Sequence, residues 1–199
     1  MIKSMFKLGI TLALFASGAC VALAIVYNIT GPVIKTQEER ALNTALKELF
    51  PDSDRFVDIT KEVSFADSKI QILNAYALQK GDNLLGVAVK ASGPSYSGNA
   101  ILLCGVNTEG KVIQVRILQL QDTPGLGANA ANPSYYVDKV NKITFTGQFE
   151  GKKVTDPFIV KEDVQAITAS TITSRSLTAI VKVSGETAWS YLQKKGGSR

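Results

Sequence analysis

Nineteen consecutive residues near the amino terminus, from Leu8 to Val26, carry no charge and are mostly apolar. A stretch of this kind is long enough to cross the hydrocarbon core of a bilayer, which needs about twenty residues of helix. In lipid, every backbone polar group must be satisfied within the segment, and a helix achieves this. The sequence therefore predicts a single membrane-spanning helix, with residues 1–30 as a membrane anchor.

Charge flanks this run on one side only. Lys3 and Lys7 precede it, whereas uncharged Asn28 follows it, so the positive-inside rule places the amino terminus in the cytoplasm and the rest of the chain outside. A signal peptide cleaved near Ala16–Ala19 is disfavoured because the apolar run continues for seven further residues. A lipoprotein signal at Cys20 lacks the leucine three positions before it. We expect an uncleaved, single-pass anchor in the cell membrane, with a periplasmic or extracytoplasmic domain.

An amphipathic pattern follows the anchor. Gly31-Pro32 is expected to end the first helix, because proline supplies no backbone N–H. From Val33 to Phe50, apolar residues recur three and four positions apart with charged residues between them, which is typical of a helix. Pro51 is expected to end this second helix. We assign residues 31–55 to this connecting helix.

The remaining residues, 56–199, contain short apolar runs separated by turn-forming residues. Strands are expected at residues 70–78, 84–90, 100–106 and 112–120, with turns at 80–83, 92–95 and 107–110. Strands joined by such short turns pair antiparallel, since a parallel pair needs a longer crossover. The predicted fold class is α+β, with a mainly antiparallel sheet and flanking helices. Smaller elements are expected after the sheet: a short helix at 132–140 and strands at 143–149 and 158–160.

The composition removes several classes of function. The 199 residues include no histidine, which excludes triads and metal sites that depend on imidazole. Two cysteines are too few for an iron–sulfur cluster, which needs about four ligands; we predict Cys104 as a buried strand residue and Cys20 within the membrane, without a disulfide. The net charge of +5 forms no basic patch, so no nucleic-acid binding is expected. We assign no catalytic residue and no metal site, and redox chemistry would need an organic cofactor.

Hydroxyl residues gather before a helix-like pattern near the carboxyl terminus. Seven lie close together: Thr168, Ser170, Thr171, Thr173, Ser174, Ser176 and Thr178. The apolar pattern that follows predicts a helix over residues 174–193. One hydroxyl, from Thr173 or Ser174, would cap this helix. The free N–H groups and the positive dipole end at its start can also hold a phosphate.

A loop rich in proline and glycine, Thr123-Pro124-Gly125-Leu126-Gly127, is a second candidate binding segment. Pro124 fixes one backbone dihedral, while Gly125 and Gly127 permit positive φ and close approach of the backbone. Such a loop can place N–H and C=O groups at the edge of a flat ring, with Leu126 on its face. Taken alone, the loop would be interpreted as an ordinary turn after a strand.

Both segments resemble motifs of one family. Residues 168–174, Thr-Ala-Ser-Thr-Ile-Thr-Ser, resemble the Ser/Thr-Gly-Ala-Thr-x-Thr motif of FMN-binding-domain proteins, the RnfG and NqrC subunits of membrane electron-transport complexes. Residues 96–98, Tyr-Ser-Gly, resemble the family's Gly-Tyr-Ser-Gly segment, and residues 123–127 match its Thr-Pro-Gly-Leu-Gly loop. Three positions differ: Ala169 replaces a glycine, Ser170 replaces an alanine, and Gln165 replaces a common aspartate.

The resemblance implies FMN as the cofactor, joined by a phosphoester to Thr171 through the action of a separate flavin transferase. The other residues that it implies for the flavin site are Thr168, Ala169, Ser170, Thr173, Ser174, Thr123, Gly125, Leu126, Gly127, Tyr96 and Ser97. An RnfG-like subunit would relay electrons between ferredoxin and NAD within a membrane complex that moves ions. Its partners would be the other subunits of that complex, and it would not be catalytic alone.

Three alternatives stay open at this point. An NqrC-like subunit of a sodium-pumping quinone reductase shares the motifs, although such chains are usually longer. A membrane-tethered interaction module without flavin would fit the three departures from the motif. A hydrolase with Ser170 or Thr171 as nucleophile would need a basic partner, and the sequence offers neither a histidine nor a Ser-x-x-Lys pattern near the site.

Overall fold

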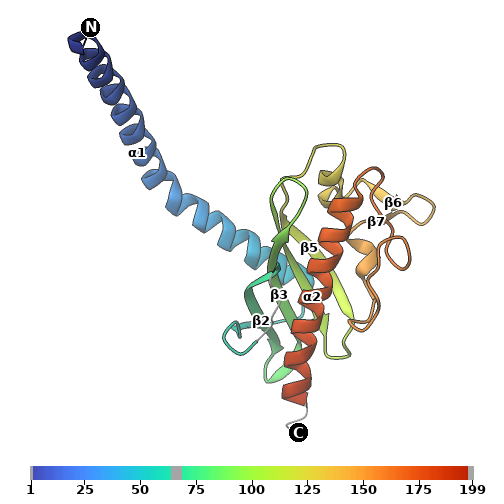
Figure 1. Ribbon diagram of the computed structural model, residues 1–199. Coiled ribbons are helices and arrows are strands. Elements are labelled where there is room, and N and C mark those ends of the chain that lie inside the picture. The colour runs from blue at the N-terminus through green and yellow to red at the C-terminus, as the bar shows by residue number, and fades with distance from the viewer. Residues whose placement is uncertain (1, 64–68, 197–199) are drawn as a thin grey trace. The chain divides into compact units, whose positions relative to one another are not determined.

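A computed structural model describes residues 2–63 and 69–196 (Figure 1). In chain order, its elements are α1 (Ile2–Leu49), β1 (Arg55–Asp58), β2 (Gln71–Lys80), β3 (Asn83–Pro94), β4 (Asn99–Asn107), β5 (Val112–Gln119), the 3-10 helix η1 (Gly127–Ala131), β6 (Tyr136–Asp138), β7 (Ile143–Thr144), the 3-10 helix η2 (Gly147–Phe149) and α2 (Thr171–Gly196). The chain divides into two compact units, Met1–Asn43 and Thr44–Arg199.

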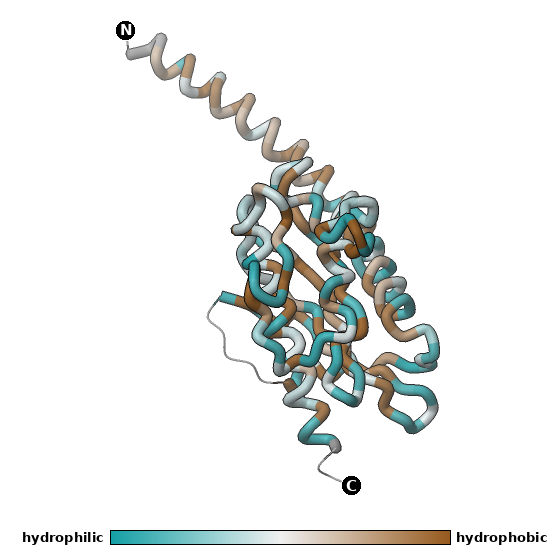
Figure 2. The backbone as a smooth tube through the Cα atoms, turned by 90° about the vertical axis from the view of Figure 1, so that its right-hand side faces the viewer, coloured by the Kyte–Doolittle hydropathy of each residue, from teal (hydrophilic) through white to brown (hydrophobic). Residues whose placement is uncertain are grey.

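The first unit consists of most of α1. An 18-residue stretch of this helix has a mean hydropathy of 2.3 and is not buried, so α1 is long and apolar enough to cross a membrane (Figure 2). The helix does not end at Gly31-Pro32, and our prediction of a break there is wrong: α1 continues through Pro32 to Leu49. Proline removes one helical hydrogen bond, and a helix can tolerate this loss when the bonds on either side of it are kept.

The second unit is built on a five-stranded antiparallel sheet in the order β1-β2-β3-β4-β5, which confirms the predicted fold class. The turn between β4 and β5 lies where we expected it, and Gly110 N donates to Asn107 O (3.1 Å). The turn predicted at 92–95 lies further along, at residues 95–98, because Ser92 and Gly93 still pair with Ile101 and Ala100 of β4. Burial of this strand end overrides the turn propensity of its residues.

Helical segments cover both faces of this sheet. α2 packs on β3 and β4 (Figure 1), and at Gly93 a Cβ atom would lie 2.8 Å from Ile180 Cγ1 of α2. Gly86 lies on the same strand, seven positions before Gly93. A Cβ atom at Gly86 would lie 2.6 Å from Phe50 Cζ. Side chains alternate between the faces of a strand, so α2 and the segment that ends at Phe50 lie on opposite faces. The second unit therefore has a helix–sheet–helix arrangement.

The segment between β5 and α2 differs from its prediction. The helix expected at 132–140 is wrong, because β6 pairs there with β7 as a small antiparallel hairpin. The Asp138 carboxylate fixes the turn of this hairpin by accepting hydrogen bonds from the N–H groups of Val140 (2.9 Å) and Asn141 (3.0 Å). An aspartate that bonds the backbone two residues ahead stabilises a turn rather than a helix.

The strands expected at 143–149 and 158–160 are also shorter than predicted. The first stops at Thr144 and is followed by η2, and the second is reduced to a single bridge from Val160 to Val164. Three aromatic side chains of these runs pack on one another instead, with ring centroids 5.6 and 6.1 Å apart: Phe145, Phe149 and Phe158. These apolar runs hold a loop against the core, which periodicity alone does not distinguish from a strand.

Cys104 lies buried on β4, as predicted, and both Cys104 and Cys20 are free cysteines. Burial among apolar neighbours raises the pKa of the Cys104 thiol to about 12. The thiol therefore stays protonated at neutral pH and acts as a small core side chain, since the thiolate is the reactive form.

Candidate functional site

The carboxy-terminal helix begins at Thr171, earlier than predicted. Thr173 and Ser174 therefore lie inside its first turn, and the prediction that one of them caps the helix is wrong. The carbonyl of Ser170 accepts the first helical hydrogen bond, from Ser174 N (3.0 Å), which makes Ser170 the capping position. Ser174 Oγ accepts from Ile167 N (3.0 Å) and donates to Ser170 O (2.9 Å), so it stabilises the chain entering the helix.

A hollow of about 380 Å³ forms where the start of α2 meets two loops, and we call it the Thr171 hollow. It is lined by Tyr96, Thr123, Leu126, Gly127, Ala169, Ser170, Thr171, Ile172 and Thr173. The structure thus brings together most of the residues predicted for the site, from three separate segments. Four predicted residues are not in the lining: Thr168, Ser174, Gly125 and Ser97. Ile172 lines the hollow although no motif or pattern in the sequence singled it out.

The hydroxyl groups near the Thr171 hollow differ in burial and in hydrogen bonding. Thr173 and Ser174 are 2% and 0% exposed, and Thr173 Oγ1 donates to Asp122 Oδ2 (2.5 Å). Thr168 is exposed but does not line the hollow. Thr171 is half-buried, lines the hollow and stands at the first position of α2. Thr171 is therefore the hydroxyl best placed to hold a group that lies in the hollow and at the helix start.

The two glycines of the 123–127 loop serve different purposes. Gly125 has a φ of +76°, a left-handed conformation that glycine adopts without strain. At Gly127, a Cβ atom would lie 2.5 Å from Thr173 Oγ1 and 2.8 Å from Asp122 Cβ, so this glycine allows the loop to approach α2 closely. The predicted positive φ and close approach are therefore both present, each at a different glycine.

Asp122 was not predicted as a site residue, yet it connects three segments around the hollow. Its side chain accepts hydrogen bonds from Ser95 Oγ (2.6 Å), Ser97 N (2.9 Å) and Thr173 Oγ1 (2.5 Å). Burial opposes ionisation of this carboxyl, but these hydrogen bonds outweigh burial and lower its pKa. The one signal in the sequence was its position immediately before the Thr-Pro-Gly-Leu-Gly loop.

Exposed apolar side chains surround the Thr171 hollow. Within the described part of the second unit, five large apolar side chains are exposed: Tyr96, Leu126, Val140, Ile159 and Ile172. Three of these, Tyr96, Leu126 and Ile172, line the hollow. Exposed apolar groups that gather at one place mark a binding site more often than scattered ones do. These three side chains offer contacts for a flat apolar ring.

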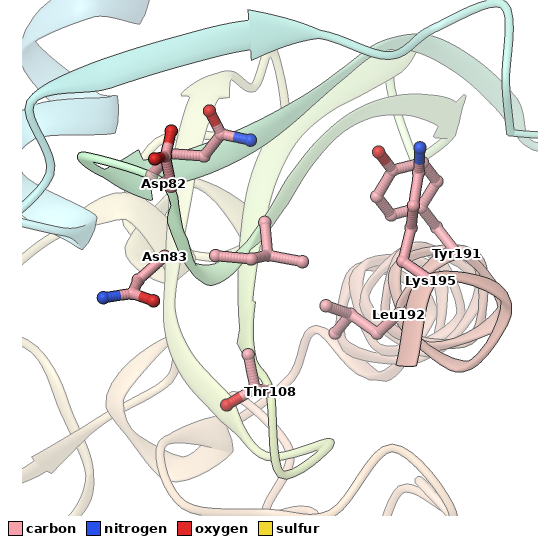
Figure 3. Close-up of a pocket in the computed structure, with 8 residues that line it drawn as sticks. Asp82, Asn83, Thr108, Tyr191, Leu192 and Lys195 are labelled. Carbon is pink, nitrogen blue, oxygen red and sulfur yellow. The ribbon is translucent and has the colours of Figure 1, made fainter. Parts of the chain in front are cut away.

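A second hollow, also of about 380 Å³, lies at the carboxyl end of α2 (Figure 3). Asp82 of the β2–β3 turn and Asn83, the first residue of β3, lie on one side of it, and Tyr191 and Lys195 of α2 lie on the other. Lys195 Nζ is 3.6 Å from Glu62 Oε2 and 5.8 Å from the centre of the Tyr191 ring, so its charge is already engaged. This hollow contains none of the predicted site residues.

Ala169 has a φ of +59°, in the left-handed region. It stands where the resembling motif has glycine, and this conformation explains why glycine suits the position. A side chain in this conformation lowers the stability of the fold by about 1–2 kcal/mol. Glycine avoids this strain, but its greater freedom in the unfolded chain reduces the gain by about 0.4–1 kcal/mol. We expect Ala169→Gly to stabilise the second unit by roughly 1 kcal/mol, measured by chemical denaturation of the full chain in detergent.

A matched control for this prediction is Ala179→Gly, at an exposed position inside α2. There the backbone is helical, so glycine should destabilise the second unit by about 1 kcal/mol. Equal destabilisation by both substitutions would contradict a strained Ala169.

The second unit contains an FMN-binding domain, as its match to the sequence model of that domain shows, and it follows a long apolar helix. The sequence model of the FMN-binding domain matches residues 95–184, and that of the RnfG N-terminal region matches residues 1–49. The chain belongs to the RnfG family, whose members are the G subunits of ion-translocating oxidoreductase complexes.

Two relatives support this assignment along most of the chain. The G subunit of the proton-translocating ferredoxin:NAD(+) oxidoreductase complex of Clostridium ljungdahlii is 34% identical, covering 87% of this chain and 84% of its own. The G subunit of the ion-translocating oxidoreductase complex of Shewanella piezotolerans is 32% identical, covering 91% and 88%. Among solved structures, NqrC of Shewanella oneidensis shares 14% identity over 68% of this chain and 74% of its own, with a TM-score of 0.46.

Proposed function

We propose that this chain is a membrane-anchored flavoprotein subunit of an Rnf-type complex that couples electron transfer between ferredoxin and NAD to ion movement. In this proposal, the chain relays electrons through FMN that is esterified to Thr171. One observation carries the choice of residue: Thr171 is half-buried, lines the hollow and stands at the start of α2. Two relatives are named as subunits of ferredoxin:NAD(+) oxidoreductase complexes, and this supports the proposal that the chain belongs to such a complex.

The residues around the Thr171 hollow fit FMN. Its volume of about 380 Å³ lies within the range of about 300–1,000 Å³ that is usual for small-molecule sites. A phosphoester between Thr171 Oγ1 and the FMN phosphorus, formed with net loss of one water, leaves about one negative charge at the helix start. The free N–H groups and positive dipole end of α2 stabilise such a charge. When bound, FMN supplies one- and two-electron redox chemistry.

Apolar side chains fit the other end of this cofactor. Tyr96, Leu126 and Ile172 line the hollow and are exposed, so a flavin ring would bury part of their surface from water. The 123–127 loop supplies backbone polar groups beside them. The chain needs no general base of its own at Thr171, because a separate flavin transferase would form the ester.

The proposed location follows from α1 and the charges beside it. We infer that α1 spans the cell membrane once, with Lys3 and Lys7 on the cytoplasmic side and the FMN domain on the periplasmic or extracytoplasmic side. A covalent bond suits that location, because a dissociable cofactor would be lost by dilution outside the cell. The proposed partners are the other subunits of the complex and, during maturation, the flavin transferase.

The test is to express the full chain with and without a flavin transferase and to measure its intact mass. We expect a gain of one FMN less one water, together with flavin fluorescence that survives denaturing electrophoresis, and both only with the transferase. An unchanged mass would contradict the proposal and would favour a tethered interaction module without flavin.

A further inference from the structure

The Asp122 carboxylate is almost fully buried, with 4% of the residue exposed. Its hydrogen-bond partners lie 27 and 25 residues before it, at Ser95 and Ser97, and 51 residues after it, at Thr173. Ser95 and Ser97 flank Tyr96, whose side chain lines the Thr171 hollow. One side chain therefore joins the turn that carries Tyr96, the start of the 123–127 loop and the first turn of α2.

The carboxylate lies directly behind the lining of the hollow. A Cβ atom at Gly127 would lie 2.9 Å from Asp122 Oδ2 and 2.5 Å from Thr173 Oγ1, and both Gly127 and Thr173 line the hollow. None of the ion pairs in the described part of the chain involves Asp122. Its charge is therefore shared with hydroxyl and backbone N–H groups and not cancelled by a bonded cation.

A buried negative charge acts strongly on groups nearby, because the protein interior screens charge less than water does. A flavin gains electrons on reduction, so a fixed anion behind its binding site opposes that gain. Three hydrogen bonds to one carboxylate also hold the surrounding backbone in place, since charge-assisted bonds are stronger than neutral ones. Asp122 can therefore act on the site in two ways, through its hydrogen bonds to the backbone and side chains and through its negative charge.

We propose that Asp122 is a positioning residue of the flavin site: it fastens the Tyr96 turn and the first turn of α2 to the 123–127 loop, and its negative charge lowers the reduction potential of the flavin in the hollow. The effect on potential rests on the proposed function. The fastening of the three segments does not depend on flavin, so the two parts are tested separately.

The first test uses the full chain without flavin and measures amide hydrogen exchange by mass spectrometry. Asp122→Ala should speed exchange at residues 95–98 and in the first turn of α2 by roughly two- to tenfold, because it removes all three hydrogen bonds. Asp122→Asn preserves the shape of the side chain and should have a smaller effect, which keeps the test valid if the alanine variant does not fold.

The matched control is Ser184→Ala, which removes another buried hydroxyl of α2, one that donates to Ile180 O (2.7 Å). It should leave exchange at residues 95–98 unchanged. Unchanged exchange there in the folded Asp122 variants, or an equal increase in Ser184→Ala, would overturn the positioning role.

The second test uses the flavin-loaded full chain and measures its midpoint potential by spectroelectrochemistry. Asp122→Asn should raise the potential, whereas Ser95→Ala, which loses one hydrogen bond but keeps the charge, should shift the potential less. A potential that is unchanged in Asp122→Asn, or shifted equally in Ser95→Ala, would overturn the electrostatic role. A wild-type chain that takes up no flavin would refute the proposed function, and hydrogen exchange would then decide the inference by itself.

Discussion

Thr171→Ala should abolish covalent flavin incorporation when the full chain is expressed with a flavin transferase. Alanine has no hydroxyl oxygen, so no phosphoester can form at the first position of α2. The loss should be complete. Of the other Ser and Thr residues that line the hollow, Ser170 and Thr173 are buried, and exposed Thr123 lies outside α2. Intact mass measures the result directly, since the variant should lack the added FMN.

Two matched variants distinguish the missing hydroxyl from general damage to the site. Thr171→Ser keeps a hydroxyl at the same place and should retain at least part of the flavin. Thr173→Ala removes a buried hydroxyl that donates to Asp122, and the flavin that this variant takes up should still be attached to Thr171. If flavin persists in Thr171→Ala, the attachment site is wrong, and Thr168, which is exposed, would be the next candidate.

The sequence predicted the sheet well because its signals are local. Each strand of the β2–β5 meander carries its own apolar run, and Gly81 and Gly110 stand in left-handed turns between strands. The prediction from local sequence failed at Pro32, because α1 continues there despite the loss of one hydrogen bond. The prediction also failed after β5. There Phe145 and Phe149 are buried in the core, and the strand ends at Thr144.

The site was predictable where it follows from short motifs and not where it depends on tertiary packing. The segments around Thr171 and Leu126 could be selected from residue types alone, and the structure places both on one hollow. The sequence analysis did not identify Asp122, because its hydrogen-bond partners lie far away in the sequence, one of them 51 residues distant. The left-handed φ of Ala169 was likewise hidden, since alanine is unusual in that conformation.

Gly127→Ala should damage the flavin site more than Gly125→Ala, although both change a glycine of the same loop. At Gly127 the new methyl group would lie 2.5 Å from Thr173 Oγ1 and 2.8 Å from Asp122 Cβ. Thr173 and Asp122 are bonded to each other, so relieving the clash must push the loop away from α2. We expect a loss of about 1–3 kcal/mol in the free energy of unfolding, as for other overpacked positions, and a marked fall in flavin incorporation.

Gly125→Ala is the matched control, because nothing lies within 4 Å of a Cβ atom at Gly125 and only its φ of +76° opposes a side chain. The backbone strain should cost about 1–2 kcal/mol, similar to the loss at Gly127. The wall of the hollow should nevertheless stay in place, so flavin incorporation by intact mass should remain near that of the wild type. The two variants are therefore separated by flavin content and not by stability. Equal flavin loss in both would show that flexibility of the loop, rather than its close contact with α2, shapes the site.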